Sequence, residues 1–319
     1  MRPSTPAIAQ PTSHSGVVRP SRARFFSPAV ELVVNANASG AGGAADVLAR
    51  ATHALRAAGA QVHARLTADE RQLADAVRGA NGRRLVLVGG DGTVHALANL
   101  DVPVLPPAAL LPAGRANNIA RALGIPVDWR AAASVAVWGR PADVDVLKVV
   151  TPERTLFAVE GVSAGFHAAA RHRYEGTNSG DLAAGVRALA AELRAFRPFA
   201  MELEVDGAPF VDRPVAQAFV SNLPFFGFGF HVDPFADWYD GRAEAIVLDA
   251  RSRRDVVRLL GAARNGHHLL HSATTWRRGR QARFDTALPL VADAQPLGVT
   301  TATVTVVAGR LHLVVPEGT

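Results

Sequence analysis

The chain has 319 residues, and its 34 lysine and arginine residues against 28 aspartate and glutamate residues give a formal charge of +6. The length suits two domains, and a content of 49% hydrophobic and 19% charged residues excludes a collagen and a wholly disordered chain. Lys148 is the only lysine, which excludes a phosphate-binding loop of the Gly-Lys-Ser/Thr type. The sequence contains no cysteine, which excludes disulfides and fits a reducing compartment.

Residues 1–28 are a basic segment that contains Arg2, Arg19, Arg22 and Arg24 and no acidic residue. The segment is rich in proline and serine and lacks the apolar stretch of a signal peptide, which predicts a disordered tail. The +2 that remains on the rest of the chain is too small for a protein that binds nucleic acid. The tail suits either a solvated linker or a contact with an anionic membrane.

No apolar run reaches the roughly 18 residues that a membrane-spanning helix requires. We therefore expect a cytoplasmic protein that is either soluble or peripheral at the inner face of the membrane. The sequence leaves the oligomeric state open.

From residue 30 onward, short apolar runs alternate with alanine-rich helical stretches. The runs at 30–34, 61–66 and 84–88 predict strands, and the stretches at 44–58 and 69–78 predict helices. Nearly continuous aliphatic strands are typical of parallel sheets covered on both faces. Residues 29–138 are therefore expected to form an α/β nucleotide-binding domain, a parallel sheet with helices on both faces.

After Pro141 the pattern changes to strand-like runs at 144–150, 155–162, 199–207, 215–222 and 243–250. Two helices are expected within this half, at Leu182–Ala195 and at 254–264. The C-terminal stretch is again composed of short strands, with Ala308-Gly309 as an expected hairpin tip. Residues 139–319 are therefore expected to form a β-rich sandwich domain that binds the substrate.

The strongest local signal is a glycine-rich loop directly after the strand at 84–88. It consists of Gly89, Gly90, Asp91, Gly92 and Thr93. The glycines allow a ligand to approach the main chain closely, and a helix that begins at about residue 94, with Thr93 as N-cap, offers free N–H groups to a phosphate. Asp91 is the only acidic side chain of the loop, and it can bind a metal ion or order the phosphate site.

Two further loops follow predicted strands. At 110–126 an apolar run leads into Gly114, and Asn117 and Asn118 then open a helix. After the first strand come Asn35, Ser39 and Gly40. Open α/β sheets bind ligands at the carboxyl ends of their strands, so the convergence of three such loops predicts one binding site.

These loops resemble the signature loops of the diacylglycerol kinase catalytic-domain family, which includes bacterial lipid kinases and the sphingosine and ceramide kinases. The resemblance rests on residues 34–40, 89–100 and 111–126, and it continues through 157–169, 220–248, 266–284 and 289–297. It implies transfer of a phosphoryl group from ATP to a lipid hydroxyl with Mg²⁺. It also implies that ATP binds between the two domains and that the lipid substrate enters from the β-rich domain.

The resemblance assigns roles residue by residue. The residues that it implies for nucleotide binding are Asn37, Ser39, Gly40, Gly89, Gly90, Asp91, Gly92, Thr93, Gly114, Arg115 and Asn117. It implies that Asp91 also binds metal, and that Asp237 and Asp240 correspond to acidic positions of a supporting Mg²⁺. It implies that Asp293 is the general base.

The chain departs from the family pattern in these loops. Where the family has Gly-Thr-Gly-Asn-Asp, this chain has Gly114-Arg115-Ala116-Asn117-Asn118. Where the family has Asp-Gly-Glu, this chain has Asp293-Ala294-Gln295, so the aspartate is kept and the glutamate is replaced. A catalytically weakened pseudokinase that binds nucleotide or lipid therefore remains an alternative. An NAD kinase-like enzyme with a soluble substrate is a second alternative, because NAD kinases share the glycine-rich loop. Diacylglycerol, sphingoid base and ceramide all remain candidate substrates.

A second basic segment lies at Arg277, Arg278, Arg280 and Arg283, and it predicts either a solvated face or a face toward anionic lipid. Phenylalanines interleave with glycines at 225–230, which indicates either core packing or an entrance for acyl chains.

Overall fold

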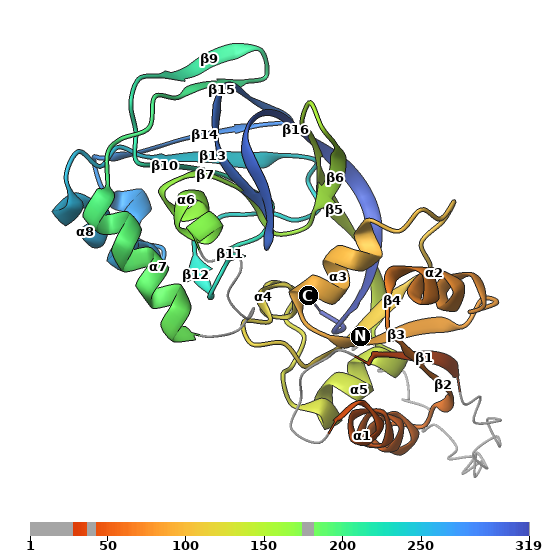
Figure 1. Ribbon diagram of the computed structural model, residues 1–319. Helices are drawn as coiled ribbons and strands as arrows, with labels where there is room; N and C mark the ends of the chain where they lie inside the picture. The colour runs from red at the N-terminus through yellow and green to blue at the C-terminus, as the bar shows by residue number, and fades with distance from the viewer. Residues whose placement is uncertain (1–27, 37–42, 174–181, 319) are drawn as a thin grey trace, which may run out of the picture.

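The computed structural model describes residues 28–36, 43–173 and 182–318. Two lobes are visible, an α/β lobe that contains the N-terminal half and a β-rich lobe that contains most of the second half (Figure 1). The predicted fold class is confirmed. The basic tail that was predicted to be disordered lies outside the described residues, except for Pro28.

The first lobe is built on four parallel strands in the order β4-β3-β1-β2. They are β1 (Ala29–Asn35), β2 (Gln61–Thr67), β3 (Arg84–Gly89) and β4 (Ala108–Pro112). Helices α1 (Gly43–Ala57) and α5 (Trp129–Trp138) cover one face, and α2 (Glu70–Arg78) and α3 (Asp91–Ala98) cover the other (Figure 1). The aliphatic strands β1, β3 and β4 are buried because both faces are covered.

The first lobe contains two further helices, of which one is short and the other was not predicted. Helix α4 (Asn118–Ala122) follows β4, as expected from the asparagine loop. Helix α5 was not predicted, although Asp128 is its N-cap and accepts a hydrogen bond of 3.0 Å from Ala131 N. Its alanine-rich face packs into the core of the first lobe.

The second lobe is mainly antiparallel. Its strands are β5 (Arg140–Val150), β6 (Thr155–Ala158), β7 (Gly161–Gly165), β8 (Glu202–Val205), β9 (Ala208–Asp212), β10 (Gln217–Ser221), β11 (Phe225–Phe226), β12 (Phe230–His231), β13 (Ala243–Leu248), β14 (Thr274–Gly279), β15 (Gln281–Ala292) and β16 (Gln295–Val315). Its helices are α6 (Phe166–Arg173), α7 (Leu182–Ala195), α8 (Arg253–Ala263) and a 3-10 turn (His267–Leu270). The long strands join in the order β14-β13-β10-β7-β15-β16.

Strand β16 connects the two lobes. It runs for 21 residues, pairs with β15 at its start, and ends with Leu313 parallel to Ala108 of β4. The expected hairpin tip at Ala308-Gly309 was therefore wrong. The two residues lie at a register shift between Val307 and Leu311, because β5 pairs with β16 on both sides of it and keeps the strand continuous.

Two further boundaries differ from the prediction. Helix α3 begins at Asp91 rather than at residue 94, and Gly90 rather than Thr93 is its N-cap. The single run predicted at 155–162 is divided into β6 and β7, and β7 continues to Gly165, whose φ of 98° turns the chain into helix α6.

Candidate active site

Four segments meet between the two lobes: the starts of α3 and α4, the turn between β6 and β7, and the turn between β15 and β16. Asp91 Oδ1 accepts a hydrogen bond of 2.9 Å from Ile119 N, which joins α3 to α4. Asp293 Oδ1 accepts one of 2.8 Å from Glu160 N, which joins the two turns. His95 of α3 lies 2.7 Å from Asp293 Oδ2 and connects the two pairs.

The glycines of the two loops are required by close packing. A Cβ on Gly90 would lie 2.7 Å from the Cα of Gly114, and a Cβ on Gly89 would lie 2.0 Å from Thr93 Oγ1. No larger side chain fits at either position without a backbone shift. The main chains of the β3–α3 and β4–α4 loops therefore touch directly at the start of α3.

The start of α3 has no side-chain cap, because its N-cap is Gly90. The first N–H groups of a helix carry partial positive charge and lack partners within the helix. Asp91 lies in this first turn. Thr93 lies within the helix, where its N–H donates to Gly90 O over 3.0 Å.

Asn117 closes its own loop. Its side-chain Oδ1 accepts a hydrogen bond of 2.9 Å from Gly114 N, and its Nδ2 donates one of 2.9 Å to Gly114 O. The residue has a φ of 48°, a conformation that asparagine tolerates better than most residues. Arg115, two residues before it, is exposed, and within the described part of the chain no acid pairs with it.

Three acidic residues of different segments interact at the centre of the site: Asp91, Glu160 and Asp293. Glu160 is 5% exposed, and its Oε2 accepts a hydrogen bond of 2.9 Å from Asn118 Nδ2. Burial, reinforced by the negative charges of Asp293 and Asp91, raises the pKa of Glu160 well above its usual value. Burial also raises the pKa of Asp91, against the opposing effect of the N–H groups of Ile119 and Asn118.

Glu160 was not among the predicted site residues. It lies between two apolar strands, and no local pattern distinguishes it from a turn residue. Its partner Asn118 is 1% exposed and also donates to Gly227 O over 2.8 Å, while its own Oδ1 has no hydrogen-bond partner. Asn118 therefore joins α4 to the loop between β11 and β12.

Asp293 is held by four donors. Its Oδ1 accepts from Glu160 N at 2.8 Å and from Gly161 N at 3.1 Å, and its Oδ2 accepts from Val159 N at 2.9 Å and from His95 Nδ1. A carboxylate offers about four lone-pair positions, so all of them are used. With these partners in place, Asp293 has no free acceptor position for a substrate hydroxyl.

Asp237 and Asp240, which were predicted to hold a supporting Mg²⁺, interact with groups of the second lobe. Asp240 forms an ion pair with Arg278, whose Nε also lies 2.8 Å from Glu244 Oε1. Asp237 Oδ1 accepts a hydrogen bond of 3.4 Å from Tyr239 N. Within the described ranges, no group of three His, Cys, Asp or Glu side chains is arranged to hold a metal ion. A guanidinium already neutralises Asp240, so a supporting Mg²⁺ does not fit this pair.

The position of Asp91 does fit a Mg²⁺ that is held mainly by phosphate oxygens. Such an ion needs only one or two carboxylates from the protein. No lysine or arginine of the described chain forms an ion pair with Asp91 or Glu160, so an added cation would compensate their charge. The predicted residues Asn37, Ser39 and Gly40 lie outside the described residues.

The phenylalanine segment borders this site and divides between core and surface. Phe226 is buried in the second lobe, whereas Phe228 is 59% exposed. The guanidinium of Arg121 lies 4.0 Å from the ring centre of Phe225 and attaches the segment to α4. An exposed aromatic side chain therefore lies one residue from Gly227, which contacts Asn118.

Two family models match the chain in sequence order. The diacylglycerol kinase catalytic domain matches residues 30–149, and the YegS C-terminal NAD kinase beta sandwich-like domain matches residues 160–315. A diacylglycerol kinase of Mycobacterium tuberculosis is 26% identical over 216 residues, which cover 63% of this chain and 66% of that protein. A protein of Klebsiella pneumoniae named probable lipid kinase YegS-like is 33% identical over 127 residues, which cover 38% of this chain and 41% of that protein.

The matched stretch thus spans less than two thirds of either relative. The crystal structure of a diacylglycerol kinase from Bacillus anthracis has a TM-score of 0.67 to this chain at 17% sequence identity. That match covers 90% of this chain and 97% of the other, and at this identity it establishes the fold. With both family models matched in order over its two lobes, the chain belongs to the diacylglycerol kinase catalytic-domain family.

Proposed function

We propose that this protein transfers the terminal phosphoryl group of ATP to the hydroxyl group of a lipid. The observation that carries the proposal is that Asp91 and Asp293 both lie at helix α3 of the first lobe. Asp91 opens α3, and Asp293 from the second lobe is bound to His95 one turn later. Phosphoryl transfer requires a phosphate site and an acidic site side by side, because catalysis consists mainly of positioning and charge stabilisation.

The start of α3 is the proposed phosphate site. Its uncapped N–H groups and the close contact of Gly90 with Gly114 leave main-chain donors for phosphate oxygens. Asp91 would hold Mg²⁺, which when bound supplies neutralisation of phosphate charge. Arg115, exposed at the neighbouring loop, is the proposed direct contact of a phosphate.

The proton of the lipid hydroxyl needs an acceptor, and we assign this role to Asp293. Three of its four donors are main-chain N–H groups, whereas His95 is a side chain that can rotate. The lipid hydroxyl would take the position of the His95 Nδ1–H at Oδ2. The main-chain donors would keep the carboxylate in place during this exchange.

A lipid is favoured as the acceptor by the aromatic segment beside the site. Phe228 is exposed and lies next to Gly227, whose carbonyl accepts from Asn118 of the site. An exposed phenylalanine at the rim of a polar site suits an acyl chain better than a soluble nucleotide. Diacylglycerol, a sphingoid base and ceramide all carry a hydroxyl and acyl or alkyl chains.

The saturation of Asp293 also favours a second candidate, a protein that binds nucleotide and lipid without transferring phosphate. An assay with radiolabelled ATP distinguishes the two. Diacylglycerol, sphingosine and ceramide in detergent micelles, and NAD in solution, are incubated with the protein and Mg²⁺, and the Asp91→Asn variant serves as control. Labelled lipid with the parent and not with the variant supports the kinase. ATP binding without any labelled product supports the second candidate, and labelled NAD contradicts both.

A further inference from the structure

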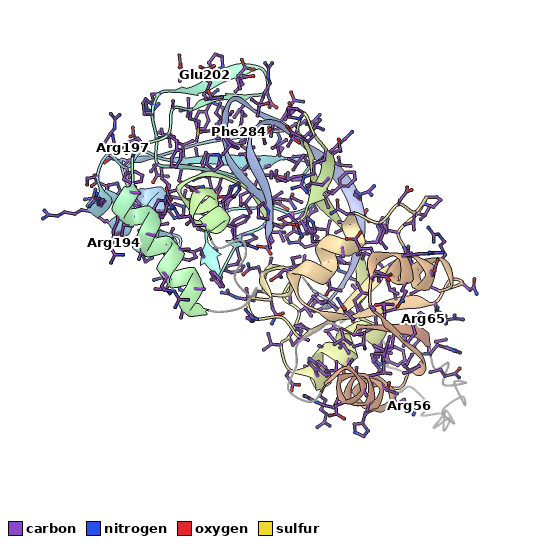
Figure 2. All side chains as sticks on the ribbon, viewed as in Figure 1. Arg56, Arg65, Arg194, Arg197, Glu202 and Phe284 are labelled. Carbon is purple, nitrogen blue, oxygen red and sulfur yellow. The ribbon has the colours of Figure 1, made fainter. Side chains whose placement is uncertain are left out.

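A groove of about 450 Å³ lies between α7 and α8 on the outer side of the second lobe. Its apolar residues are Leu193 and Val257. Its other lining residues are all arginines, Arg194, Arg253, Arg254 and Arg258. Figure 1 shows the two helices side by side, and Figure 2 shows Arg194 and Arg197 at the C-terminal end of α7. None of these residues belongs to the candidate active site.

Most of this positive charge is not neutralised within the protein. Arg194, Arg253 and Arg254 form no ion pair with any residue that the structure describes, and each is exposed. Arg258 contacts Asp255 over 3.3 Å at the surface. The lining of the groove contains no carboxylate. The face therefore presents a concentrated positive charge to solvent.

The basic segment at Arg277, Arg278, Arg280 and Arg283 differs from this face, because most of its arginines bind other groups of the lobe. Arg277 donates to Pro209 O over 3.0 Å, Arg278 pairs with Asp240 and Glu244, and Arg283 pairs with Asp285. Three of its four arginines are thus engaged inside the lobe. Of the four arginines that line the groove on α7 and α8, only Arg258 forms an ion pair with a described residue.

Apolar side chains accompany the arginines on this face. Val257 of α8 is 54% exposed, and Val186 and Leu189 of α7 are 58% and 38% exposed. Arginines beside exposed aliphatic side chains are the composition of helices that lie at a membrane interface, where the guanidinium binds phosphate and the aliphatic group enters the acyl boundary. A nucleic acid or an acidic protein would use the charge and leave these aliphatic groups without a role.

We infer that the α7–α8 face docks onto a membrane surface that contains anionic phospholipid, with the four arginines at the headgroup phosphates and Val257 at the acyl boundary. The inference rests on charge complementarity and on the exposed aliphatic groups. It does not depend on the proposed kinase activity, because no residue of the groove takes part in the site at Asp91, Glu160 and Asp293.

The test is sedimentation of the full-length protein with vesicles of phosphatidylcholine alone or of equal parts phosphatidylcholine and phosphatidylglycerol. The triple variant Arg194→Glu, Arg253→Glu, Arg254→Glu is compared with the parent. We expect the parent to bind the anionic vesicles in a salt-sensitive manner. Since each arginine near an anionic surface contributes about a fivefold change in binding, the triple variant should bind about 100-fold more weakly.

The matched control is Arg56→Glu, Arg71→Glu, Arg130→Glu, which changes three exposed arginines of the first lobe by the same charge. Replacement of Arg194, Arg253 and Arg254 by lysine should retain most of the binding, since it keeps the charge. Val257→Asn should weaken the binding that persists at high salt. Equal losses in the triple variant and its control would overturn the inference, as would unchanged sedimentation of the triple variant.

Discussion

His95 Nδ1 lies 2.7 Å from Asp293 Oδ2, although the two residues are 198 positions apart in the chain. Asn99 Nδ2 lies 3.4 Å from the other ring nitrogen, Nε2, which fits the tautomer in which Nδ1 carries the proton and donates it to the carboxylate. This hydrogen bond ties α3 of the first lobe to the β15–β16 turn of the second. Asn99 forms a second connection between the two lobes, because its Nδ2 donates a hydrogen bond of 2.8 Å to Phe157 O of β6.

Replacement of Asp293 tests two roles separately: its structural role as an acceptor of main-chain N–H groups, and its proposed role as the acceptor of the hydroxyl proton. In Asp293→Asn an amide NH₂ would face N–H donors that the carboxylate now accepts, so the free energy of unfolding should fall by about 3 kcal/mol. If Asp293 is also the proton acceptor, turnover well below the melting temperature should fall by about 10²–10⁴. His95→Ala, which leaves an acceptor position open at Oδ2, should keep phosphoryl transfer. Equal turnover losses in the two variants would show that Asp293 is a structural residue only.

Asp91→Asn should weaken the binding of ATP with Mg²⁺ by roughly tenfold or more, because it removes the one carboxylate of the glycine-rich loop. The asparagine carbonyl can still accept from Ile119 N, so the loop should keep its conformation. Isothermal calorimetry of both proteins, with and without Mg²⁺, measures the effect. Asp101→Asn, an exposed acid of the same lobe, is the control. Identical affinities of parent and Asp91→Asn would exclude Asp91 as the metal-binding residue.

Glu160 should make the stability of the fold depend on pH. Its pKa is raised in the folded protein above the usual value of 4.5, so the folded state binds more protons than the unfolded state between those two pKa values. The stability is therefore highest below pH 4.5 with respect to this group, and it falls as the pH rises toward the folded pKa.

Glu160→Gln removes the charge and keeps an acceptor for Asn118 Nδ2. Relative to the parent, the variant should gain stability as the pH rises through the neutral range, which thermal unfolding in the absence of nucleotide measures. A constant difference between the two proteins at every pH would contradict the buried charge at Glu160.

Arg278 should make the second lobe independent of divalent metal. It lies directly across the β13–β14 pair from Glu244 and also pairs with Asp240. Its guanidinium therefore already neutralises the negative charge that a supporting Mg²⁺ would neutralise. EDTA should leave the melting temperature of the nucleotide-free protein unchanged. Arg278→Gln should lower the free energy of unfolding by about 1–3 kcal/mol, since it leaves the buried Glu244 and the partly buried Asp240 without their ion pair.

Arg283→Gln is the matched control, because Arg283 pairs with Asp285 at a half-exposed position where ion pairs contribute about 0–1 kcal/mol. A melting temperature of the parent that falls in EDTA and recovers with Mg²⁺ would show that a metal ion is needed in this lobe despite Arg278.

The sequence by itself determined the local elements of the first lobe and the position of its loops. Aliphatic runs such as 84–88 predicted strands, because a parallel strand that is covered on both faces carries apolar side chains on both faces. The glycines at 89 and 90 predicted close main-chain approach, and the structure gives the reason in the contact with Gly114. Helix α7 has the predicted bounds, because an alanine-rich stretch with leucines at helical spacing forms a helix in most contexts.

Only the tertiary structure decided which side chains share a site. Glu160 lies in a turn between apolar strands, and its pKa is raised first by burial and then by the charges of Asp293 and Asp91, which come from distant segments. The occupied acceptor positions of Asp293 depend on main-chain N–H groups, which no residue pattern specifies. Arg278 faces Glu244 because β13 and β14 are neighbours in the sheet, and the same guanidinium pairs with Asp240, which precedes β13. Residue identity limits which chemistry is available, whereas distance and burial decide which groups interact, and these are properties of the folded chain.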